Sequence, residues 1–182
     1  MGKFALLIGV SEYSEGEDPL SDLPAALNDV RQLAEVLEDQ NIGGFQVKSL
    51  ENPSGGQMRS EIEALFADRN ADDLVLLYFS GHGITDQKGQ FFFSTPKTRK
   101  DQRGFLVKSS AIPAQEVHGY MDDCASDRMV VILDCCHSGA FGDLISRDAG
   151  EIKFEPQLGG RGRVVLTASA AIDYSYERSG EE

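Results

Sequence analysis

Two short polar motifs in this chain carry residues that could perform covalent chemistry. They are Ser80-Gly81-His82-Gly83 and Asp134-Cys135-Cys136-His137-Ser138-Gly139. Each follows a run of apolar residues that predicts a buried strand, so a histidine and a pair of cysteines both stand where a strand ends. Parallel α/β sheets place their functional groups at such ends. A thiol with a histidine as its base is the minimum equipment of a cysteine nucleophile.

Backbone amides beside these side chains could stabilise the negative charge of an acyl-transfer intermediate. The amides of Gly83 and Cys136 are the natural oxyanion donors. Of the two adjacent cysteines, one must face the sheet and the other the site, because side chains alternate along a strand. Periodicity alone does not decide whether Cys135 or Cys136 is the nucleophile.

The same residues admit other interpretations. Cys135, Cys136, His137 and His82 could bind zinc, but adjacent cysteines do not match the usual spacing of zinc ligands. A buried cysteine at a strand end is also a common packing residue. His118 and His137 are expected to make only local hydrogen bonds.

Apolar runs and helical patterns alternate along the chain and must position the two motifs. The runs predict strands at residues 4–10, 45–50, 74–79, 129–133 and 163–168. Helical spacing predicts helices at 24–40, with Asp22 as its cap, at 55–69 and at 113–121, and residues 90–94 predict a small hairpin arm. This alternation indicates an α/β fold with a mostly parallel sheet covered by helices on both faces.

Length and composition suit a single soluble domain. The chain has 182 residues, a net charge of -13 and only three cysteines, two of them adjacent. The charge argues against nucleic acid or an anionic membrane as a partner, since both require clustered Lys and Arg. Sparse cysteines predict a reducing compartment, and no segment approaches a membrane span, so a cytoplasmic location is expected.

Three motifs resemble those of the metacaspases and their prokaryotic relatives, in the caspase-like clan of cysteine proteases. Tyr78–Gly83 and Asp134–Gly139 are similar to the two signature motifs, and Gly9–Tyr13 followed by Leu23–Asp29 is similar to the N-terminal block. The resemblance implies a three-layer caspase-like fold and a cysteine endopeptidase of a signalling, cell-death or defence system. It divides the domain 1–182 into a p20-like core (3–140), a flexible processing-type loop (140–162) and the start of a p10-like part (163–182).

The resemblance also implies a role for each site residue. Cys136 becomes the nucleophile and His82 its partner, which can act mainly by protonating the leaving amine. Asp29, Ser80 and Asp134 are placed in the pocket for the substrate residue before the cleaved bond. Two carboxylates in a narrow pocket favour a guanidinium or an ammonium group, so we expect a protein or peptide substrate with Arg or Lys at that position.

This chain departs from the family pattern in two respects. Many members bind calcium, and Asp143 matches one ligand, but residues 84–89 lack the expected acidic run. We therefore expect no required cofactor; Asp86, Asp101 and Asp122-Asp123 are the other carboxylates that could contribute. The apolar runs also lack the family's last strand, which predicts a missing p10-like strand. Either the chain is truncated, or it has been cleaved and a separate C-terminal p10-like fragment is its partner. The candidate self-processing sites are Arg147, Lys153, Arg161, Arg163 and Arg178.

Two other functions fit parts of the pattern. The chain could be a non-catalytic caspase-like interaction or regulatory module, although such a scaffold has no physical need for the cysteine, histidine and acidic residues together. A hydrolase or transferase acting on a non-peptide acyl group would use the same side chains.

Overall fold

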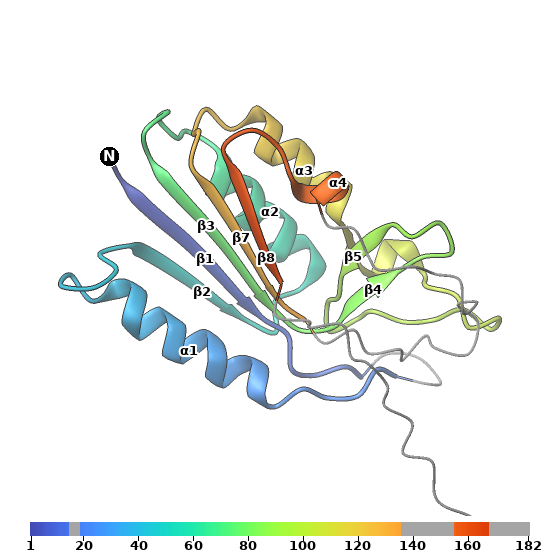
Figure 1. The fold of residues 1–182 in the computed structure, drawn as a ribbon. Coiled ribbons are helices and arrows are strands. Elements are labelled where there is room, and N and C mark those ends of the chain that lie inside the picture. The colour runs from blue at the N-terminus through green and yellow to red at the C-terminus, as the bar shows by residue number, and fades with distance from the viewer. Residues whose placement is uncertain (15–18, 136–154, 168–182) are drawn as a thin grey trace, which may run out of the picture.

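In the described part of the chain, five parallel strands form the central sheet, whose arrangement can be followed in Figure 1. The computed structural model describes residues 1–14, 19–135 and 155–167 of the chain. The strand order is β2-β1-β3-β7-β8, and every pairing is parallel. The strands are β1 (Lys3–Gly9), β2 (Gln46–Glu51), β3 (Leu74–Ser80), β7 (Met129–Asp134) and β8 (Arg163–Thr167). The predicted mostly parallel sheet is confirmed.

Helices cover both faces of this sheet, as predicted (Figure 1). The helix α1 (Ala25–Glu38) packs on one face, where its Val30 joins a core with Ala5, Leu7 and Leu76. The helices α2 (Gly55–Phe66) and α3 (Ala114–Asp123) lie on the other face, over a larger core that contains Phe79. The inner strands are continuous apolar runs because both of their faces are buried.

The two long helices begin in different ways. The Ser54 hydroxyl accepts a hydrogen bond from the Gln57 amide at 3.2 Å and caps α2. The predicted capping role of Asp22 is wrong, because α1 begins after Pro24 without a side-chain cap. The Asp22 carboxylate instead accepts a hydrogen bond from the Tyr13 amide at 2.9 Å, which is a contact within the loop before the helix.

A small antiparallel sheet flanks the main one. Its strands are β4 (Gly83–Thr85), β5 (Phe91–Phe93) and β6 (Ile112–Pro113), with the 3-10 turn η1 (Lys108–Ser110) just before β6. The predicted hairpin arm at 90–94 is therefore present as β5. A one-turn helix, α4 (Glu155–Leu158), lies within the range expected to be loop, and its Gln157 side chain accepts a hydrogen bond from the Phe91 amide at 2.6 Å.

Strand register brings the ends of three strands to one edge. Gly9 of β1 pairs with Ser80 of β3, and Ser80 pairs with Asp134 of β7. Because the strands are parallel, the residues that follow them leave the sheet side by side. The histidine motif and the cysteine motif therefore meet at the carboxyl edge of the sheet, as the apolar runs predicted.

The strand β8 lies at one edge of the described sheet, and β7 is its one neighbour among the described strands. Its Val164 and Leu166 are 51% and 50% exposed, and they align with Val130 and Ile132 on the face that α1 covers elsewhere. The family's last strand, which the sequence analysis expected to be missing, has no counterpart in the described ranges. None of the described helices has the length and apolarity needed to cross a membrane.

Candidate active site

The His82 side chain is buried directly after β3, with 1% of the residue exposed. Its Nε2 lies 2.8 Å from the backbone carbonyl oxygen of Ser21. A carbonyl can only accept, so Nε2 carries the proton in this arrangement and Nδ1 is the nitrogen with the lone pair. The Ser21 carbonyl thus fixes which ring nitrogen of His82 can act as a base.

The surroundings of His82 favour its neutral form. Burial lowers the pKa of the imidazole below its ordinary value of 6.5, and the hydrogen bond to the Ser21 carbonyl acts in the opposite direction. Because the pKa is lowered, the ring is unprotonated at pH 7. In that state His82 can take a proton from a thiol and later return it to a leaving group.

The glycines beside His82 allow close packing of the turn. A Cβ added to Gly81 would come within 2.8 Å of the Phe79 ring and 3.1 Å of the Tyr13 hydroxyl. A Cβ added to Gly83 would lie 2.6 Å from the Phe91 ring. Such distances are shorter than real Cβ contacts, so both positions exclude a side chain. Both glycines make room for neighbouring aromatic side chains.

The register of the small sheet sets the direction of the Gly83 amide. The Ser94 amide donates to the His82 carbonyl at 3.1 Å, so the pair 82/94 is a hydrogen-bonded position of the antiparallel ladder. Gly83 opposite Phe93 is then a non-hydrogen-bonded position, because the two kinds alternate. The Gly83 N–H therefore points away from β5.

Of the two cysteines in the second motif, Cys135 lies within the described residues and Cys136 lies outside them. Cys135 is 2% exposed and lies in the core cluster with Phe79, Phe91 and Leu133. Cys135 is therefore a packing residue. Cys136, the predicted nucleophile and second oxyanion donor, lies outside the described residues.

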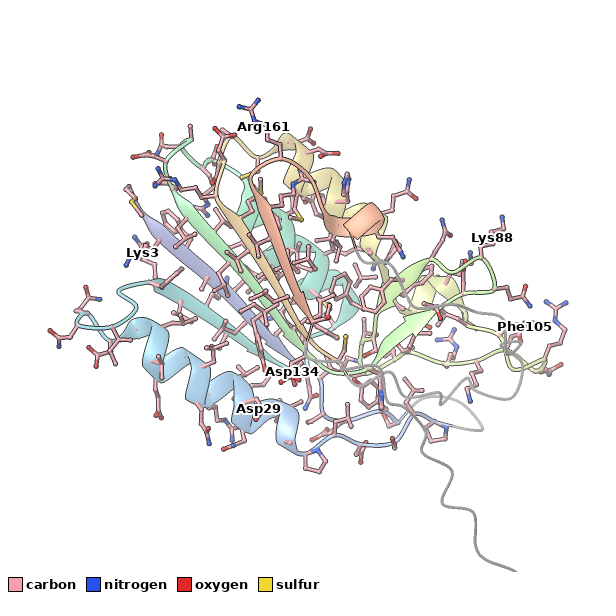
Figure 2. The ribbon with its side chains drawn as sticks, viewed as in Figure 1. Lys3, Asp29, Lys88, Phe105, Asp134 and Arg161 are labelled. Atoms are coloured by element: carbon pink, nitrogen blue, oxygen red, sulfur yellow. The ribbon has the colours of Figure 1, made fainter. Side chains whose placement is uncertain are left out.

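The predicted pocket residues gather around one tyrosine. The Tyr78 hydroxyl donates to Asp134 Oδ2 at 3.0 Å, and Ser80 lies on the same face two residues further along β3. Burial first, and then the hydrogen bond to Asp134, raise the pKa of Tyr78, and the charge of Asp29 acts in the same direction. Figure 2 shows Asp29 on α1 next to Asp134 at the end of β7. The structure thus brings Asp29, Ser80 and Asp134 together.

Tyr78 was missed by the sequence analysis as a site residue. A signal for it exists, because alternation along β3 puts Tyr78 on the same face as Ser80. Its phenol stays protonated, so it remains a donor that holds the Asp134 carboxylate in one orientation.

Carboxylates considered for calcium serve other purposes where they are described. Asp86 pairs with Lys108, Asp101 accepts from the Arg103 and Phe105 amides, and Asp122 pairs with Arg163. In the described ranges no three His, Cys, Asp or Glu side chains are close enough to hold a metal ion. Asp143, and the Cys136 and His137 of the zinc alternative, lie outside these ranges, so calcium and zinc remain untested.

Two of the basic residues proposed for self-processing are described. Arg163 begins β8, its side chain is 6% exposed, and its guanidinium donates to Asp122 at 2.7 Å. A peptide bond within a paired strand is a poor substrate, so the structure argues against Arg163. Arg161 is exposed, but it lies at the end of the sheet opposite to Asp134 (Figure 2). Arg147, Lys153 and Arg178 lie outside the described residues.

Comparisons with known proteins agree on one family. A family model described as the caspase domain matches residues 2–179. The chain is 25% identical to Metacaspase-7 of Arabidopsis thaliana over 169 residues, which is 83% of this chain and 38% of that protein. It is also 25% identical to Metacaspase-8 of the same plant over 172 residues, 86% of this chain and 42% of that protein. The chain therefore spans about two fifths of the length of these relatives.

A solved structure has a similar fold. Protein GSU0716 from Geobacter sulfurreducens superimposes with a TM-score of 0.59 at 17% identity, over 76% of this chain and 52% of that one. At this identity the likeness concerns the arrangement of helices and strands.

Proposed function

Because this chain belongs to the caspase domain family, we propose that it is a cysteine endopeptidase that cleaves after Arg or Lys. The observation that carries the proposal is the register of β3 and β7, which sets Ser80 opposite Asp134. The histidine motif and the cysteine motif begin from these two positions. A buried, neutral histidine beside the strand that leads to Cys136 is the arrangement that thiol catalysis requires.

In the proposed reaction the Cys136 thiol attacks the carbonyl carbon of the peptide bond while His82 takes the thiol proton on Nδ1. The amides of Gly83 and Cys136 donate to the oxyanion that forms. When the C–N bond breaks, His82 gives the proton to the leaving amine. Water then hydrolyses the thioester, and one of its protons returns to the sulfur.

The acidic pocket supports the choice of substrate. Asp29 and Asp134 act on the same Tyr78 phenol, so two negative charges lie close together beside the carboxyl end of β7. A guanidinium or ammonium group would neutralise both charges, whereas an acidic side chain would be repelled. We infer a substrate with a basic residue before the cleaved bond, in a signalling, cell-death or defence process.

The position of Arg161 bears on self-processing. Arg161 lies before β8 at the amino-terminal edge of the sheet, and a strand of this length separates it from the carboxyl edge by about 15–20 Å. Cleavage there would occur between two molecules rather than within one. Sparse cysteines support a reducing compartment, and we propose the cytoplasm.

The direct test uses two fluorogenic peptides that differ only in the residue before the reporter, Arg in one and Asp in the other. We expect turnover of the Arg peptide and at least about 100-fold less of the Asp peptide, because the pocket carboxylates repel a third negative charge. Turnover of the Asp peptide alone would overturn the pocket assignment. Turnover of neither, together with no reaction of Cys136 with a basic peptidyl electrophile, would favour the interaction module.

The pH dependence of cleavage tests the state of His82. Because the pKa of His82 is lowered from 6.5, the acidic limb of kcat/KM for the Arg peptide should be centred below pH 6.5, and kcat/KM should be level at pH 7 and above. An acidic limb centred at or above pH 7 would contradict a buried neutral histidine.

Unfolding must be separated from this titration. With a folded-state pKa below the unfolded value, unfolding takes up a proton, so the stability that neutral His82 contributes is complete above pH 6.5 and is lost as pH falls. Near-UV circular dichroism at each pH, and recovery of activity on return to pH 7.5, provide the control.

A further inference from the structure

We propose that Tyr13 is the positioning residue that holds His82 in its catalytic orientation, an inference that rests on the proposed function of His82. The Tyr13 hydroxyl accepts a hydrogen bond from the His82 amide at 3.0 Å. The Tyr13 ring also lies against the imidazole, with 4.8 Å between the ring centroids and 52° between the ring planes. One side chain therefore fixes both the backbone and the ring of His82.

The hydroxyl of Tyr13 replaces a bond of the β-ladder. The Ser94 amide donates to the His82 carbonyl, so an ordinary antiparallel pair would return the His82 amide to the Ser94 carbonyl. The His82 amide bonds to the Tyr13 hydroxyl instead. The turn of the histidine motif is thus built around a side chain from another part of the chain.

The Tyr13 hydroxyl uses its one donor and both of its acceptor positions in hydrogen bonds. It donates to the Val10 carbonyl at 3.1 Å, because a carbonyl can only accept. It then accepts from the His82 amide and from the Ser94 hydroxyl, whose oxygen is 2.8 Å away. Burial raises the pKa of Tyr13 to about 12, so the donated proton is present throughout the working pH range. The orientation of the phenol is fixed by three partners.

The loop that carries Tyr13 is itself anchored. The Asn52 side chain accepts from the amides of Ser11 at 2.8 Å and Glu12 at 3.2 Å. The Leu23 amide donates to the Ser11 carbonyl at 2.8 Å, and Asp22 accepts from the Tyr13 amide. The same loop supplies the Ser21 carbonyl that bonds to Nε2 of His82. Tyr13 and Ser21 therefore hold the imidazole through two contacts from one anchored loop.

Tyr13 acts through His82 and not on the substrate, because it is 4% exposed and surrounded by core residues. Its loss should displace the imidazole relative to the thiol without altering the pocket carboxylates. A displacement of this kind lowers the rate of the chemical step. We therefore expect kcat to fall about 10- to 100-fold on substitution, with KM for the Arg peptide unchanged.

The experiment compares Tyr13→Phe, which removes the hydroxyl, with Tyr13→Leu, which also removes the aromatic ring. Tyr120→Phe is the matched control, because it deletes a hydroxyl that bonds to Glu116 on α3, away from His82. We expect kcat to be lower in Tyr13→Phe than in the wild type and lower still in Tyr13→Leu. In Tyr120→Phe kcat should stay at the wild-type value. Ser94→Ala removes one partner of the phenol and should lower kcat less than Tyr13→Phe does. If Tyr13→Leu does not fold, the test compares Tyr13→Phe with Ser94→Ala.

An NMR titration of the histidines gives a readout that does not need activity. The chain has three histidines, and a His82→Gln variant assigns the His82 resonance. We expect the pKa of His82 to rise towards 6.5 in both Tyr13 variants, because a ring that is no longer held becomes more hydrated. A wild-type kcat and an unshifted His82 titration in Tyr13→Phe would overturn the proposal, as would a lowered Tm with kcat unchanged.

The two proposals can fail separately. If the wild-type protein cleaves no peptide while its His82 pKa is low and shifts in Tyr13→Phe, the peptidase assignment fails and the positioning role stands. If the protein cleaves the Arg peptide and the Tyr13 variants match it in kcat, the positioning role fails and the peptidase assignment stands.

Discussion

Replacing Cys136 by Ala is expected to lower kcat/KM for an Arg peptide by at least about 10⁴-fold, to the level of the uncatalysed reaction plus binding effects. The loss is this large because the thiol forms the covalent bond, and no neighbouring group can replace it. The measurement is the initial rate of peptide cleavage at pH 7.5, together with labelling of the thiol by a peptidyl electrophile that carries Arg.

Cys135→Ala is the matched control, since it also removes one thiol, from the residue next to Cys136. Cys135 is packed in the core on the α2 and α3 face, so its loss should lower the free energy of unfolding by about 1 kcal/mol and leave kcat/KM within a few-fold of wild type. Retained activity in Cys136→Ala with loss in Cys135→Ala would mean that the other sulfur is the nucleophile.

Asp134→Asn is expected to lower kcat/KM for the Arg peptide by about 30-fold or more. Asparagine keeps the size of the side chain and an oxygen that can accept from Tyr78, so the substitution removes mainly the charge that pairs with the substrate. Breaking a desolvated charge pair costs about 2–5 kcal/mol, which corresponds to at least a 30-fold change. Steady-state kinetics with Arg and Lys peptides measure the loss.

Asp123→Asn tests whether this effect is local. It makes the same change in net charge at an exposed position on α3, and kcat/KM should stay at the wild-type value. An equal loss in both variants, or none in Asp134→Asn, would contradict a role for Asp134 in substrate selection. Asp29→Asn should act in the same direction as Asp134→Asn, because both charges act on the same phenol.

The inner strands of the main sheet were predictable because they are covered on both faces. Residues 74–80 and 129–134 are apolar almost throughout, and such runs are typical of central parallel strands. The strands β4 and β6 were not predicted as elements, since three residues and two residues carry no readable period. Their pairing depends on β5, which lies between them in the small sheet.

Local rules failed where a distant partner offered a better bond. Asp22 precedes a helix and is a residue type that often caps helices. Its carboxylate accepts from the Tyr13 amide and not from an amide of the helix. Arg163 has the residue type of a processing site, but its side chain is buried in a pair with Asp122. In both cases the competing partner is nine or more residues away, beyond the reach of a pattern in the sequence.

By itself the sequence determined the two motifs, the strands that lead to them and the side chains available for thiol chemistry, because residue type and apolar runs are local properties. Only the tertiary structure decided that Cys135 faces the core, that Tyr78 holds Asp134, and that Tyr13 and Ser21 hold His82. The contacts to His82 join residues 61 and 69 positions apart, and the pairing of β1 with β3 together with the bonds from Asn52 and Asp22 brings them together.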